Sequence, residues 1–113
     1  MIDCLIVGSG PAGISAALTL KANGVSFVLV GLKTVSVKVE QAEKISNYPG
    51  LFSVSGAAFK DALETQLAGE EIEVEIERVT GVYAMNGYFT TLTESGKAYE
   101  SKSRCRLCHP QVF

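Results

Sequence analysis

CLIVGSGPAGISAAL, residues 4–18, decides how this chain is expected to fold. An apolar run stops at Gly8, and Gly10 and Gly13 follow at the offsets of a G-x-G-x-x-G motif. The run suits a strand buried on both faces, and residues 13–23 have the apolar spacing of a helix. In such a turn the first glycine permits the reversal, the second leaves room for a pyrophosphate, and the third allows close packing. Because a helix amino end also attracts anions, the motif predicts a dinucleotide-binding turn; a glycine-rich turn without a ligand is the alternative.

A second apolar run at residues 25–30 completes a strand, turn, helix and strand within about thirty residues, the spacing of a βαβ unit. The end of this second strand reads Val30-Gly31-Leu32-Lys33 and carries no acid. In many dinucleotide-binding folds a carboxylate about twenty residues beyond the glycines binds the ribose hydroxyls. The residues alone therefore leave the choice between FAD and NAD(P) open.

One more helix is expected after a loop without a clear period. Residues 31–48 predict this loop, with a short extended piece at residues 35–39. Ser55 is expected to cap the helix, which ends at Gly69. Its predicted apolar stripe consists of Phe59, Ala62, Leu63 and Leu67.

The second half of the chain predicts strands. Residues 71–77 alternate Glu with Ile and Val, which is typical of an edge strand. Three further runs, residues 79–85, 88–93 and 97–103, are separated by Asn-Gly and Ser-Gly and predict a three-stranded antiparallel meander. The fold class is therefore α/β: a Rossmann-like domain with a βαβ core plus a meander.

The composition favours a small-molecule partner. The chain has 113 residues and a net charge of −2 with interspersed signs, so we expect no nucleic-acid partner and no membrane partner. No signal peptide or membrane span is recognisable, and three cysteines do not form a secreted disulfide framework, which together predict a cytoplasmic protein.

Two stretches together resemble the flavin domain of the low-molecular-weight bacterial thioredoxin reductase family. They are DCLIVGSGPAGISAALTLKANGVSFVLVG (residues 3–31) and AEKISNYPGL (residues 42–51), and the resemblance extends over residues 2–103. It implies that FAD is the cofactor and that its pyrophosphate lies against the glycine turn. The residues carried over for cofactor binding are Gly8, Gly10, Pro11, Ala12 and Gly13 in the turn, Asn47 at the flavin end and the backbone of Val79 at the adenine.

The resemblance also predicts that the FAD-binding domain is incomplete at its C-terminal side. The family's NADPH domain, with its redox Cys-x-x-Cys, has no counterpart here, and where many members have Gly-Gly-Gln this chain has Val37, Lys38 and Val39. The strand beside the first strand is expected to come from beyond residue 103. Without it the sheet would have an open edge, so we expect self-association or a missing second half.

Residues 104–113 form an atypical tail, so the predicted division is 1–103 and 104–113. Cys105, Cys108 and His109 match a haem attachment motif, and their spacing also suits a redox dithiol or a metal site. A frameshift near Ser103 is the third hypothesis, because these codons read one base later give the Ala-Thr that the family has here. We assign no metal-binding residue.

Three functional hypotheses follow. The first is the FAD-binding part of an oxidoreductase that passes electrons from a reduced nicotinamide or ferredoxin-like donor through FAD to a dithiol. The second is a non-catalytic nucleotide-binding remnant, and the third is an NAD(P)-binding module. No catalytic residue can be assigned, because the one histidine lies in the tail.

Overall fold

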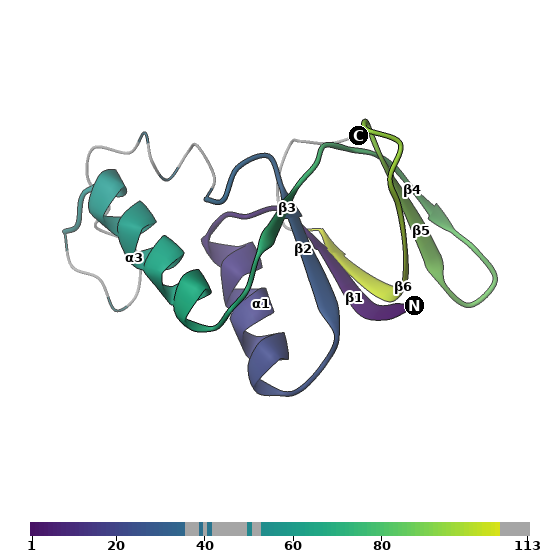
Figure 1. Ribbon diagram of the computed structural model, residues 1–113, viewed down its shortest axis with the longest axis horizontal. Coiled ribbons are helices and arrows are strands. Elements are labelled where there is room, and N and C mark those ends of the chain that lie inside the picture. Colours follow the sequence, from purple (N-terminus) through teal and green to yellow (C-terminus); the bar gives the residue numbers. More distant parts are fainter. Residues whose placement is uncertain (36–38, 40, 42–49, 51–52, 107–113) are drawn as a thin grey trace.

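A computed structural model describes residues 1–35, 39, 41, 50 and 53–106 and contains one sheet with helices on one side of it (Figure 1). The strands are β1 (Ile2–Val7), β2 (Phe27–Gly31), β3 (Val74–Ile76), β4 (Val79–Ala84), β5 (Phe89–Thr93) and β6 (Ala98–Arg106). Helix α1 (Pro11–Ala22) joins β1 to β2, and α3 (Gly56–Gly69) precedes β3. The sheet order is β3-β2-β1-β6-β5-β4. The predicted α/β class, βαβ unit and antiparallel meander are confirmed.

Strand β6 belongs to both the antiparallel and the parallel part of the sheet. Its beginning pairs antiparallel with β5, from Ala98 opposite Leu92 to Ser101 opposite Phe89. From Ser101 onward it pairs parallel with β1, ending with Arg106 opposite Val7. The expectation that a segment beyond residue 103 supplies the neighbour of β1 is therefore wrong: nine residues span about 30 Å, enough to serve both partners. The proposed division at residue 103 falls inside this strand.

The two faces of the sheet are covered differently. Helices α1 and α3 pack on one face, whereas β4 and β5 curve over the other (Figure 1). The helix side has its core around Ile6, Ile14, Ala17, Leu29, Val35, Val39, Phe59, Leu63, Leu67 and Ile72. The opposite core is smaller and consists of Leu5, Val7, Val30 and Val79. Successive residues of β1 thus enter opposite cores, as a strand buried on both faces requires.

Helix α3 begins where the sequence predicts it. Ser55 adopts an extended conformation, and its hydroxyl accepts a hydrogen bond from the Ala58 N–H at 3.1 Å. Phe59, Leu63 and Leu67 are buried at a spacing of four residues. Ala62, which was expected in the same stripe, is exposed because it lies off this row.

Two other expectations concern β3 and the segment that follows β2. Strand β3 lies at the edge of the sheet and pairs with β2 alone among the described residues, so the predicted edge strand is confirmed. The extended piece expected at residues 35–39 is wrong for the residues that can be described: Val35 is a bend and Val39 is helical, and both are buried in the helix-side core. No helix in the described ranges has the length and hydropathy needed to cross a membrane.

Candidate dinucleotide-binding site

The glycine turn lies at the carboxyl end of β1 and leads directly into α1. Gly8 has a φ of 121°, a region that favours glycine, and this explains why the apolar run stops there. The Gly8 N–H donates a 2.8 Å hydrogen bond to the carbonyl of Val30 in β2. The turn is therefore held against the neighbouring strand before any ligand is present.

Gly13 is needed for packing inside the turn. A Cβ at this position would overlap the carbonyl oxygen of Gly8 and lie 3.6 Å from Cγ2 of Ile6. The first turn of α1 therefore sits directly on the glycine turn as well as on the strand.

Gly10 differs from the other two glycines of the motif. It is the N-cap of α1 with φ −78° and ψ −178°, extended backbone that any residue can adopt. The chain geometry therefore gives no reason for glycine at this position. The remaining reason is the space in front of the helix, which a side chain would fill.

The amino end of α1 suits an anion. The N–H groups of Ala12 and Gly13 lie in the first turn, where the helix itself offers them no acceptor. No side chain caps the helix and no acid stands in its first turn, whereas Lys21 lies in its last turn. Free donors, an unopposed helix dipole and a missing side chain at Gly10 together fit a phosphate group.

The position of the glycine turn within the sheet also suits a ligand. From β1 the chain proceeds through α1 to β2 on one side, whereas β6 flanks β1 on the other side. The carboxyl ends of β1 and β6 meet where Val7 pairs with Arg106. In open α/β sheets ligands bind outside the carboxyl ends of strands at such a switch point, and Gly8 follows it immediately.

The structure places most of the remaining candidate residues. Val79 is 1% exposed and packs with Val7 and Val30, so it lies beside the ends of β1 and β2 and can offer a ligand only its backbone. Asn47 lies outside the described residues, as do Cys108 and His109 of the tail. Among the described residues no three His, Cys, Asp or Glu side chains gather into a metal site.

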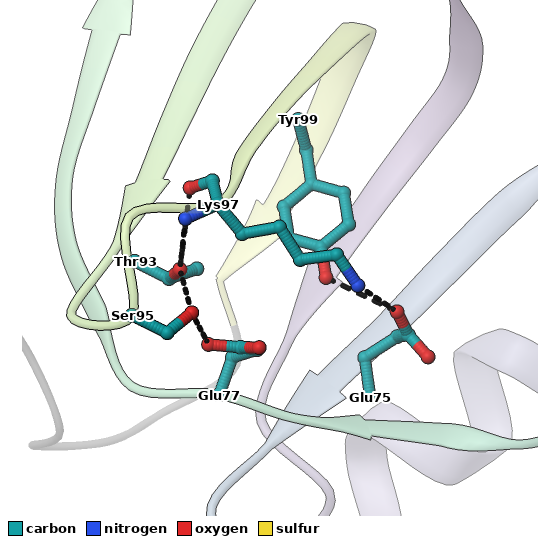
Figure 2. A network of polar contacts seen from close by, with 6 residues as sticks. All are labelled: Glu75, Glu77, Thr93, Ser95, Lys97 and Tyr99. Atoms are coloured by element: carbon teal, nitrogen blue, oxygen red, sulfur yellow. Dashed lines mark hydrogen bonds and ion pairs between the residues drawn. The ribbon is translucent and has the colours of Figure 1, made fainter.

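A network of polar contacts connects Glu75 and Glu77 with residues of β5, β6 and the turn between them (Figure 2). Glu77 lies two residues before Val79 in the chain. Glu75 on β3 accepts hydrogen bonds from the Lys97 ammonium at 2.9 Å and the Tyr99 hydroxyl at 3.2 Å. Beside it, Ser95 donates to Glu77 at 2.6 Å, and Ser95 is 3.2 Å from the Thr93 hydroxyl. The network therefore ties the end of β3 to the turn between β5 and β6.

The ionisation of this network is coupled. The hydrogen bond from Lys97 and its charge lower the pKa of Glu75, and the hydrogen bond to Glu75 raises the pKa of Lys97. Burial is the main cause that raises the pKa of Tyr99. The sequence predicted only an edge strand here, because the alternation of Glu residues does not reveal what lies opposite them.

Sequence reasoning also missed Ser9, which lies between the first two glycines of the motif. Ser9 is 4% exposed, and its hydroxyl donates a 2.6 Å hydrogen bond to the carbonyl of Lys33. The signal in the sequence was Gly31, a glycine at the end of a strand without an apparent turn function.

Comparison with known proteins agrees with this geometry. Residues 2–104 match the pyridine nucleotide-disulphide oxidoreductase family. Thioredoxin reductase of Helicobacter pylori is 34% identical over 105 residues, which cover 91% of this chain and 34% of that protein. Ferredoxin–NADP reductase of Ignicoccus hospitalis is 35% identical over 111 residues, covering 90% and 34%.

Solved structures show the same likeness. A ferredoxin-flavin thioredoxin reductase from Clostridium acetobutylicum has a TM-score of 0.86 and 35% identity, with 96% of this chain and 39% of that chain covered. The present chain thus spans about a third of the length of the curated relatives it matches. By sequence and by fold, the chain belongs to the pyridine nucleotide-disulphide oxidoreductase family and resembles the FAD-binding Rossmann-like domain of thioredoxin reductases.

Proposed function

We propose that this chain binds FAD as part of a thioredoxin-reductase-like flavoprotein. In that protein, electrons pass from a reduced nicotinamide or a ferredoxin-like donor through FAD to a disulfide. The observation that carries the proposal is the start of α1. No side chain caps this helix, no acid lies in its first turn, and its N-cap Gly10 has an extended backbone that would accept any residue. The names of the relatives, a thioredoxin reductase and a ferredoxin–NADP reductase, support the reaction class.

The residues of the glycine turn divide the work of binding a pyrophosphate. Gly8 makes the reversal, and Gly10 leaves room for the approaching phosphates. Pro11 has no N–H and fixes the first helical residue, so the donors are the N–H groups of Ala12 and Gly13. These groups are in place before binding, which lowers the entropy cost of holding the phosphates.

The two ends of the cofactor are assigned from the resemblance. The backbone of Val79 would contact the adenine, consistent with its burial beside Val7 and Val30. Asn47 would contact the flavin end. When bound, the flavin supplies the redox chemistry, while the chain binds and orients it.

A nucleotide-binding chain that does not reduce disulfides by itself is the second candidate. The chain spans about a third of each curated relative, so disulfide reduction by the whole protein stays a proposal. For this candidate, as for the first, we predict that Cys105 and Cys108 are not the redox dithiol. Flavin binding should survive the double substitution Cys105→Ser with Cys108→Ser. If the parent's flavin is reduced by a dithiol and the flavin of this variant is not, the prediction is wrong.

Gly10→Val tests the phosphate assignment. The extended backbone at Gly10 accepts a β-branched residue, so the variant should keep its fold but lose saturable binding of FAD and ADP. Gly69→Val is the matched control, because a Cβ there meets nothing within 4 Å. Flavin fluorescence titration and ADP calorimetry measure the affinities, and circular dichroism verifies the fold. If folded Gly10→Val binds either nucleotide as the parent does, the assignment is wrong.

A further inference from the structure

Ser9 connects the turn after β1 to the turn after β2. Its side chain is buried, and its hydroxyl donates to the carbonyl of Lys33, 24 residues further along the chain, at 2.6 Å. Lys33 lies two residues beyond the end of β2. One side-chain hydrogen bond thus joins the phosphate-binding turn to the loop beside the expected adenosine ribose.

Gly31 makes room for this hydrogen bond. A Cβ at Gly31 would overlap Oγ of Ser9 and lie 2.8 Å from Cβ of Ser9. Its φ is outside the left-handed region, so the backbone at this position would accept other residues. Side chains at positions 9 and 31 therefore exclude one another, and this explains why a glycine ends the strand.

This exclusion bears on how the ribose is recognised. Position 31 stands at the end of the second strand, where many dinucleotide-binding folds carry a carboxylate that binds the ribose hydroxyls. In this chain the space beside that position is taken by Ser9. An acid at position 31 would displace the serine and break its hydrogen bond to Lys33.

We propose that Ser9 is a positioning residue for the nucleotide and that it replaces the ribose-binding acid. By fixing the glycine turn against the loop after β2, it presents the N–H groups of Ala12 and Gly13 in one arrangement. The affinity for the diphosphate then depends on Ser9, and the ribose 2′-hydroxyl contributes little. The inference rests on the proposed nucleotide binding at the glycine turn.

The first experiment compares Ser9→Ala with Ser15→Ala. Ser15 is exposed in the second turn of α1, so the control removes a hydroxyl from the same helix region without touching the turn. Calorimetry with ADP, well below the melting temperature, should give about tenfold weaker binding for Ser9→Ala, the equivalent of one hydrogen bond. Ser15→Ala should bind ADP as the parent does. Equal affinities for all three proteins would overturn the positioning role.

The second experiment tests the mutual exclusion. Gly31→Ala should lower the melting temperature of the parent chain. In the Ser9→Gly background the same change should lower it less, because only the Lys33 carbonyl oxygen, 3.1 Å from the added Cβ, remains close. The combined variant should bind ADP as weakly as Ser9→Gly does. If Gly31→Ala lowers the melting temperature by the same amount in both backgrounds, the side chains at positions 9 and 31 do not compete for space.

The third experiment compares ADP with 2′-deoxy-ADP, a readout that a purely structural role of Ser9 would not change. The parent should bind the two within about twofold, because no acid at position 31 meets the hydroxyl. Ser9→Gly combined with Gly31→Asp opens the space, supplies the carboxylate and should prefer ADP about tenfold. A tenfold preference in the parent would contradict the replacement and point to another acid, such as Glu77, whose N–H bonds to the Gly31 carbonyl. A parent that binds neither ADP nor FAD would instead refute the proposed function.

Discussion

Gly13 has no room for a side chain in the glycine turn. Because a Cβ would overlap the Gly8 carbonyl oxygen, which is backbone, relief requires α1 to move away from the turn. Gly13→Ala should therefore destabilise the fold by about 1–3 kcal/mol, the usual cost of overpacking. Gly69→Ala, with open space around it, should be neutral or stabilising by up to about 1 kcal/mol. Urea denaturation measures both, and a Gly13→Ala variant as stable as the parent would contradict the close packing.

For single residues, the sequence predicted part of the candidate site. The motif identified the three glycines, and the structure gives a reason for two of them: backbone conformation at Gly8 and packing at Gly13. At Gly10 the backbone is extended and does not itself require glycine. Ser9 could not be identified, because its partner is a backbone carbonyl in a different turn. Contacts of this kind depend on how two loops approach each other, and residue patterns do not encode that distance.

Helix α3 depends on its cap at Ser55. The serine hydroxyl satisfies the Ala58 N–H, which the helix itself leaves without an acceptor. Ser55→Ala should lower the free energy of unfolding by about 1 kcal/mol, whereas Ser55→Asp should retain the cap. Thermal or urea denaturation measures the difference. Equal losses in both variants would show that the cap does not stabilise α3.

The polar network at the end of β3 should make stability depend on pH. The pKa of Glu75 is lowered in the folded chain, so its stabilising contribution is present above the ordinary glutamate pKa of about 4.3 and is lost as the pH falls through the folded value. The pKa of Lys97 is raised, so its contribution is present below the ordinary lysine pKa and is lost as the pH rises through the folded value.

Glu75→Gln is therefore expected to flatten the loss of stability between about pH 5 and pH 3. Glu73→Gln is the matched control, since Glu73 is exposed and lies directly before β3. Urea midpoints measured across this range test the expectation. Identical pH profiles for Glu75→Gln and the parent would mean that the Glu75 carboxylate adds nothing to the fold.

Elements with a strong local signal were predicted well. The apolar run of β1, the Ser55 cap and the Asn-Gly turn each depend on residues close together in the chain. Residues 35–39 had no such signal. Of the two that can be described, Val35 is a bend and Val39 is helical, and both are buried in the core. Their expected extended piece failed because tertiary packing outweighs the local preference of Val for strands.

The order of the strands in the sheet depends on β6, which lies between β1 and β5. The sequence predicted its first half as a meander strand, but its pairing with β1 joins residues 99 positions apart, such as Ile2 and Ser101. Strand partners at that distance follow from how the meander curves, which no local pattern contains. The expected gap beside β1 is therefore filled by the chain's own strand.

An open edge nevertheless remains at the second half of β6. Beyond Ser101, the described part of β6 pairs with β1 on one side and with no strand on the other. Unpaired N–H and carbonyl groups along such an edge favour pairing with another chain. We expect self-association that increases with protein concentration in sedimentation velocity. A chain that stays monomeric up to its solubility limit would show that this edge is protected.

The central claim is that the glycine turn binds the diphosphate of an adenine dinucleotide. Titration of the ¹⁵N-labelled chain with ADP, followed by amide resonances, tests it most directly. Saturable shifts are expected, largest for Gly10, Ala12 and Gly13 and smaller near Val79. Absence of saturable shifts, or shifts centred on the surface between α3 and β3 around Glu64 and Glu73, would contradict it.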